Sequence, residues 1–247
     1  MKRFLTLLKV EGRVALRGID GIFFGVLMPV GIALLIGMIC GDKPAFEGAE
    51  YTFVQGSFAA LITVGICATA FMGIPLTLAD YRDKKILKHY CVTPVSPAVI
   101  LLVQVVINMI TALVSAVAVY LMMKFGFEYQ LQGSILGFIG SYMLVMVAMY
   151  GLGMLMASLC TTVKTANLVC TLVYFPMLFL SGATIPYEVL PSPLQATANI
   201  LPLTQGIKLL KGYSLGTPAS DLAFPILLML GIALISSVIA VKKFRWE

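Results

Sequence analysis

The sequence is poor in charged residues. Asp, Glu, Lys and Arg together make up 11% of the 247 residues, less than half the share found in a typical soluble domain. Hydrophobic residues make up 60%, and the mean hydropathy is +1.00. This balance excludes an ordinary soluble domain and indicates a chain that lives in a membrane.

Motifs for catalysis and nucleotide binding are also missing. The sequence contains no G-x-x-x-x-G-K-[ST], no HExxH and no GxSxG. Its single histidine, His89, stands in a charge-rich segment between apolar runs, so no histidine-based catalytic or metal site is expected at membrane depth. The five cysteines are scattered and form no CxxC, so we expect neither a metal site nor a disulfide framework. Any ATP hydrolysis would have to come from another chain.

Six apolar runs are long enough to cross a membrane as helices, since about 20 residues span the hydrocarbon core. The predicted fold is therefore an all-α polytopic membrane protein in which one transmembrane domain covers 1–247. No charged residue falls inside these runs, which counts against ion-coupled transport, because the driving ion usually binds such groups at membrane depth. The predicted spans cover 21–40, 53–78, 98–123, 133–159, 165–185 and 222–241.

The positive charges predict the orientation of these spans. If the N-terminus is cytosolic, 13 of the 17 Lys and Arg residues fall on the cytosolic side and only four on the other. Cytosolic loops carry such an excess, so both termini are predicted to be cytosolic. The net charge of +6 follows from this bias and does not indicate nucleic-acid binding. The four outer residues are Lys43, Lys124, Lys208 and Lys211.

Residues 1–20 are predicted to form an amphipathic helix that lies in the membrane interface. Lys9, Arg13 and Arg17 share one arc of this helix, which suits anionic headgroups, while apolar residues gather on the opposite arc. Glu11 falls among the apolar residues. It either pairs with a neighbouring basic side chain or contacts a cytosolic partner.

A charge-rich segment separates the second and third predicted spans. We expect a short cytosolic helix over 80–92, in which the charges mostly avoid one apolar face. This helix is either a contact surface for a cytosolic partner or only a signal for membrane topology. The candidate contact residues are Asp80, Arg82, Asp83, Ile86, Leu87 and Tyr90.

Two further groups of residues are candidates for function. Prolines break the apolar segment 186–214 into short helices, which either re-enter the outer leaflet as a gate or rest on the outer surface. Gln104 and Asn108 are polar residues inside the third span, and they either line a pathway or form hydrogen bonds between helices. The gate candidates are Pro186, Glu188, Pro191 and Pro202.

Several motifs resemble the membrane subunit of ABC-2 type transporters, the permease half of type V ABC exporters. The N-terminal K-V-E-G-R-V-A-L-R is similar to the connecting helix of that family, and the segment ending T-P-V-S-P is similar to its coupling segment. The outer S-G-A-T-I-P-Y-E-V-L-P-S-P-L-Q, the later N-I-L-P-L-T-Q-G-I-K and the final K-K-F-R-W-E also match. One departure is Asp80-Tyr81-Arg82-Asp83, which stands where the family often has E-R-E; another is Lys85, which replaces a glycine.

The resemblance implies a permease that exports a hydrophobic or amphipathic compound, such as a drug, an antibiotic, a peptide or a lipid-like molecule. It implies a separate ATPase subunit that binds ATP and Mg, with no cofactor on this chain. A second permease chain, identical or different, would complete the pathway in a bacterial cytoplasmic membrane. The alternatives are an ion-coupled secondary transporter, a non-transporting structural subunit and, least supported, a membrane enzyme.

Overall fold

The computed structural model describes residues 2–18, 22–41, 43–46, 48–49, 51–86, 97–182, 187, 190–218 and 220–243. Across these ranges the regular secondary structure is helical, apart from an isolated bridge between Pro44 and Thr52. Six helical stretches are long and apolar enough to cross a membrane, which confirms the predicted all-α class and the six candidate spans. They are Phe23–Cys40, Phe53–Asp83, Val99–Phe127, Ile135–Leu159, Val163–Leu180 and Ala223–Ala240.

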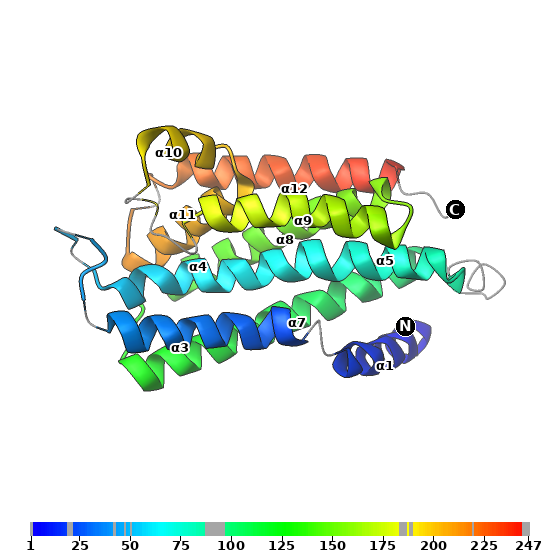
Figure 1. The fold of residues 1–247 in the computed structure, drawn as a ribbon, viewed down its shortest axis with the longest axis horizontal. Coiled ribbons are helices and arrows are strands. Elements are labelled where there is room, and N and C mark those ends of the chain that lie inside the picture. The colour runs from blue at the N-terminus through cyan, green and yellow to red at the C-terminus, as the bar shows by residue number, and fades with distance from the viewer. Residues whose placement is uncertain are drawn as a thin grey trace.

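Helix α1 covers Lys2–Arg17 and precedes the spans. The first span joins a π-helical segment to an α-helix, and the second span has a π-helical segment between two α-helices. Two short helices stand before the last span (Figure 1). The elements are η1 (Phe23–Leu27), α3 (Met28–Cys40), α4 (Phe53–Ala68), η2 (Thr69–Gly73), α5 (Ile74–Asp83), α7 (Pro97–Phe127), α8 (Ile135–Leu159), α9 (Val163–Leu180), α10 (Ser192–Ala198), α11 (Pro202–Leu215) and α12 (Ala223–Lys243).

The second span is the centre of the bundle. In its most apolar window 83% of the residues are buried, compared with 22–44% in the other spans. Its run from Phe58 to Phe71 is apolar or small on every side, and a helix that is hydrophobic all round packs in the interior. The surrounding spans leave large side chains such as Leu35, Leu172 and Leu234 exposed, as a surface that faces lipid requires.

The two ends of the bundle differ in charge and in structure. Helix α1, the end of α5, the turn between α8 and α9 and the end of α12 lie at one end, while α10 lies at the opposite end (Figure 1). We call the end that contains α1 and the end of α5 the basic end. Its described residues include Lys9, Arg13, Arg17, Arg82, Lys164 and Lys242.

The second span is longer than the sequence predicts. The helix continues past Leu78 to Asp83 and ends where Lys85 takes a left-handed conformation with φ of 56°. Asp80–Asp83 is therefore the last turn of α5 rather than the start of a separate helix, because a helix can run beyond the apolar core into polar surroundings. The rest of the predicted 80–92 helix, from Leu87 onward, lies outside the described residues.

The segment before the last span contains two helices that each begin at a proline. Pro191 is the N-cap of α10, and Pro202 is at the start of α11, where the missing N–H of proline is tolerated. Helix α11 packs against α4, α8 and α12, and it buries Leu203, Ile207 and Leu210. Its position relative to a membrane stays a prediction. Pro186 and Glu188 lie outside the described residues.

Candidate functional site

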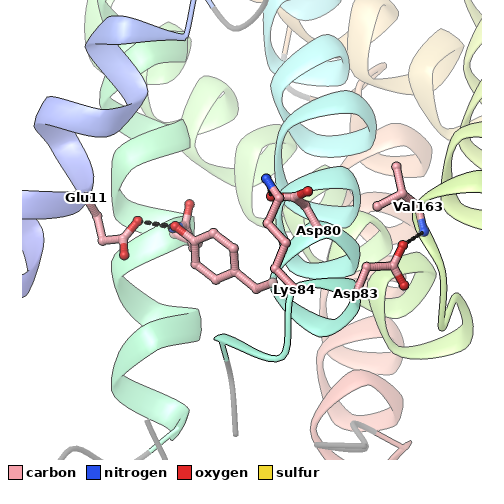
Figure 2. A network of polar contacts seen from close by, with 7 residues as sticks. Glu11, Asp80, Asp83, Lys84 and Val163 are labelled. Carbon is pink, nitrogen blue, oxygen red and sulfur yellow. Dashed lines mark hydrogen bonds and ion pairs between the residues drawn. The ribbon is translucent and has the colours of Figure 1, made fainter. Parts of the chain in front are cut away.

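The last turn of α5 contacts several other elements at the basic end of the bundle. Consecutive residues on an α-helix point about 100° apart, so three in a row reach most of the circumference. Accordingly, Tyr81 contacts α1 and α7, Arg82 contacts the end of α8, and Asp83 contacts the start of α9. Figure 2 shows Glu11 on one side of the turn and Val163 on the other.

Tyr81 belongs to a buried polar cluster with Glu11 and Gln104. The Tyr81 hydroxyl donates to the Glu11 carboxylate, and Gln104 Nε2 donates to Glu11 Oε2 at 2.9 Å. Glu11, Gln104 and Tyr81 are only 6%, 5% and 9% exposed. A buried carboxylate without donors costs several kcal/mol, so these donors hold α1 to α5 and α7.

Arg82 binds the carboxyl end of α8. Its Nη1 atom donates to the carbonyl oxygens of Ala157 and Cys160, both at 2.6 Å. The last carbonyls of a helix lack partners within the helix and carry the negative end of its dipole. The guanidinium group therefore meets both the hydrogen-bonding need and the charge of this helix end.

Asp83 binds the start of the next helix. Its Oδ2 atom accepts a hydrogen bond from the Val163 amide at 3.1 Å, and Val163 is the first residue of α9. The amino end of a helix is the positive end of its dipole. Arg82 and Asp83 thus bind the two sides of the α8–α9 turn. Each side chain has a charge opposite in sign to the helix end that it contacts.

Two predicted contact residues, Asp80 and Ile86, contact groups of this same chain among the described residues. Lys84 Nζ and Asp80 Oδ2 form an exposed ion pair at 2.8 Å, four positions apart, and such surface pairs contribute about 0–1 kcal/mol. Ile86 packs beside Tyr81 and Ile100 within the chain. Leu87 and Tyr90 lie outside the described residues, so an apolar surface for a partner stays a prediction.

Helix α1 divides its faces in a different way from the prediction. Glu11 faces the bundle and is buried, whereas Lys9, Arg13 and Arg17 are exposed. Leu5, Val10, Val14 and Leu16 are also exposed, and they lie beside the basic arc. Glu11 contacts Tyr81 and Gln104 within the bundle, and the sequence predicts neither contact.

Gln104 and Asn108 both contact neighbouring protein groups. Gln104 binds Glu11, and Asn108 Nδ2 donates to the Gln104 carbonyl at 2.9 Å. The Asn108 side chain also packs closely against Gly73. A role in lining a pathway stays a prediction for both.

The sequence pointed to Glu11, Arg82 and Asp83, but it placed Glu11 in the interfacial helix and the other two in the charge-rich segment. It missed Tyr81, because no spacing rule links a residue in the second span to one in the N-terminal helix. The α8–α9 turn was missed because its contribution is backbone carbonyl and amide groups, which every sequence has. An aromatic hydroxyl between two charged residues was the one available signal.

The comparisons with known proteins agree with this architecture. A family model described as ABC-2 type transporter matches residues 2–214. Nodulation protein J of Rhizobium leguminosarum bv. trifolii is 38% identical over 85 residues, or 32% of each chain. Inner membrane transport permease YhhJ of Escherichia coli is 24% identical over 166 residues, which is 66% of this chain and 44% of the relative.

These matches span less than half the length of the relatives, so they support the family better than any single activity. A member of this family is the transmembrane component of an ABC transport system and not its nucleotide-binding ATPase. With six apolar spans, the chain is a multi-pass membrane permease, and it belongs to the ABC-2 type transporter family.

Proposed function

We propose that this chain is the permease subunit of an ATP-driven exporter and that a separate ATPase subunit moves it through the last turn of α5. The pathway would carry a hydrophobic or amphipathic compound, because the spans are apolar and their predicted cores contain no charged residue. ATP and Mg would be bound by the partner subunit. Two permease chains and two ATPase subunits would form the working unit.

The contacts of Tyr81, Arg82 and Asp83 are the observation that carries this proposal. A displacement of this turn acts at once on α1, α7, α8 and α9, since each has a direct polar contact with it. Packed helices move as rigid bodies and switch between discrete arrangements. A displacement of this turn is therefore expected to move several spans together.

The surroundings of the turn support a docking place for a cytosolic subunit. The exposed charged side chains near it are mostly basic, from Lys9, Arg13 and Arg17 on α1 to Lys84 on α5. The same bias of positive charge predicts that this end faces the cytosol. One relative is named an inner membrane transport permease, which supports a bacterial cytoplasmic membrane. Helices α10 and α11 would then stand at the exit.

The test compares variants of the turn in a complex with the cognate ATPase, which has to be identified first. In a background without native cysteines, a fluorophore on Lys164→Cys reports movement of the α8–α9 turn. We expect the unaltered turn to give a fluorescence change on adding ATP and vanadate. Arg82→Gln should reduce this change at least about threefold while the ATPase still binds, because the variant loses a charged donor to two carbonyls.

Lys84→Gln is the matched control, since it removes a nearby positive charge that has only an exposed partner. It should leave the fluorescence change within about 20% of the unaltered value, because such pairs contribute little. An equal loss in both variants would show that net charge matters and the α8 contact does not. A full fluorescence change in Arg82→Gln would refute the proposal that the ATPase moves the permease through this turn.

A further inference from the structure

Two π-helical segments lie together where the first two spans pack. We propose that η1 and η2 form a paired hinge on which α5 tilts, with Thr69 and Tyr150 fixing its axis. The source of the motion rests on the proposed function, whereas the hinge itself rests on local geometry. π-helical segments inside α-helices occur often at functional sites and mark sharp bends.

The same sequence feature follows each segment. Pro29 and Pro75 each stand two residues after the end of η1 and η2. A proline ring clashes with the carbonyl four residues earlier and provides no N–H, and a wider turn relieves that clash. Accordingly, the Met28 amide donates to the Phe23 carbonyl, five residues back. The Ile74 amide donates to the Thr69 carbonyl in the same way.

Proline alone does not produce this geometry, because Pro176 lies inside α9 without a π-helical segment in the described residues. The two π-helical segments differ from that site by containing glycine. A methyl group on Gly25 would lie 3.4 Å from Thr69 Cγ2, so η1 and η2 pack directly on each other. A methyl group on Gly73 would lie 2.1 Å from Asn108 Oδ1.

Helix α7 presents a polar stripe to this pair. Gln104, Asn108, Thr111 and Ser115 recur at spacings of four, three and four residues, which places them on one face. A methyl group on Gly25 would lie 3.1 Å from Thr111 Cγ2, while Gln104 reaches Glu11. The stripe therefore runs from the candidate site to the paired segments.

Thr69 connects η2 to α8. Its hydroxyl lies 3.0 Å from the Gly65 carbonyl and 2.9 Å from the Ile66 carbonyl, and both carbonyls also accept from the Thr69 amide at the end of α4. It is also 2.9 Å from the hydroxyl of Tyr150, which is 3% exposed on α8. A methyl group on Gly153 would lie 2.2 Å from the Ala70 carbonyl oxygen, so α8 touches η2 at backbone distance.

The length of α5 sets how far such a hinge moves the candidate site. The helix has ten residues, or about 15 Å, so a tilt of about 10° at η2 displaces Asp83 by about 2.6 Å. That displacement is comparable to a hydrogen-bond length. It is therefore enough to carry the α8–α9 turn with it or to break the Asp83 contact.

Hydrogen exchange on the purified permease tests the hinge without any partner. We expect amides in 71–74 to exchange at least about tenfold faster than those in 61–67, since a hinge would open locally. Pro75→Ala should slow this exchange, because it restores a donor and removes the clash. Pro176→Ala is the matched control and should leave 71–74 unchanged. Unchanged exchange in Pro75→Ala would overturn the hinge.

The role of Thr69 is tested by exchange in two variants. Thr69→Val keeps the shape but loses the hydroxyl, so exchange at 69–74 should rise at least about threefold. Thr69→Ser keeps the hydroxyl and should restore the native rate. If the valine variant does not fold, the same comparison is made with Tyr150→Phe. Native exchange in a folded Thr69→Val or Tyr150→Phe would remove these residues from the hinge.

A distance measurement in the complex separates the hinge from the proposed function. Spin labels on Lys84→Cys and Lys242→Cys, both exposed at the basic end, should shift by about 2–3 Å on adding ATP and vanadate. Pro75→Ala should reduce that shift below about 1 Å. An equal shift in Pro75→Ala would overturn the hinge. If the distance between the two spin labels does not change on adding ATP and vanadate while the exchange results are as expected, the hinge is supported and the proposed function is contradicted.

Discussion

Removal of the Tyr81 hydroxyl group tests the attachment of α1 to the bundle. Tyr81→Phe keeps the ring but deletes the donor to Glu11. The carboxylate stays buried at 6% exposure, and Gln104 remains as a donor at 2.9 Å. The variant should therefore fold, with a measurable loss of stability.

The expected loss follows from the charge and burial of the acceptor. A hydrogen bond to a charged group contributes about 1.5–3 kcal/mol. For a chain of this size each kcal/mol corresponds to about 2–4 °C, so the thermal midpoint should fall by about 3–12 °C. Tyr213→Phe removes a hydroxyl on α11 at a distance from this cluster. It should shift the midpoint by less than about 2 °C.

A double-mutant cycle with Glu11→Gln isolates the contact itself. The midpoint of thermal unfolding in detergent is measured for both single variants and for the double variant. Because the two side chains are in direct contact, the cycle should give a coupling free energy of about 1–3 kcal/mol. Additive effects within about 0.5 kcal/mol would refute the reasoning, since they would mean that Tyr81 does not stabilise the Glu11 carboxylate.

Three further predictions follow from other contacts. Gly153→Ala should destabilise the permease by about 1–3 kcal/mol, because its methyl group would lie 2.2 Å from a backbone oxygen; Gly231→Ala, with open space around it, should be neutral or stabilising in the same thermal assay. Asp83→Asn keeps an acceptor for the α9 amide but loses the charge beside the helix dipole, so it should lower the unfolding free energy by about 0.3–1 kcal/mol, and a loss above about 2 kcal/mol would contradict this account. In intact cells without native cysteines, Lys43→Cys should react with an impermeant thiol reagent and Lys85→Cys should not; strong labelling at Lys85 would reverse the orientation.

Periodicity and composition were sufficient for the broad architecture. The lipid environment demands long apolar helices, so each span appears in the sequence as an uninterrupted run with charges only at its ends. The second span shows the limit of this signal. Apolar content locates the part that crosses the membrane core, but the helix continues to Asp83 because backbone hydrogen bonding does not stop where apolar residues do.

The candidate site was predictable only in part. Charges are conspicuous in a chain that has few of them, so Glu11, Arg82 and Asp83 could be selected from the sequence. Gln104 was also selected, as a polar residue inside a span, but nothing in the sequence pairs it with Glu11. Tyr81 was not selected, because a tyrosine at the end of a span is unremarkable in isolation. The contacts of Arg82 with α8 involve carbonyl oxygens that carry no sequence signal.

The sequence by itself determined that this chain crosses the membrane, how many apolar spans it has and where its few charges fall, since these depend on local composition. Only the tertiary structure decided that Glu11 is buried beside Tyr81 and Gln104, that Arg82 and Asp83 hold the α8–α9 turn, and that two proline-linked π-helical segments meet. These features join residues that are as many as 93 positions apart. Packing brings them together, and no local pattern in the sequence encodes that proximity.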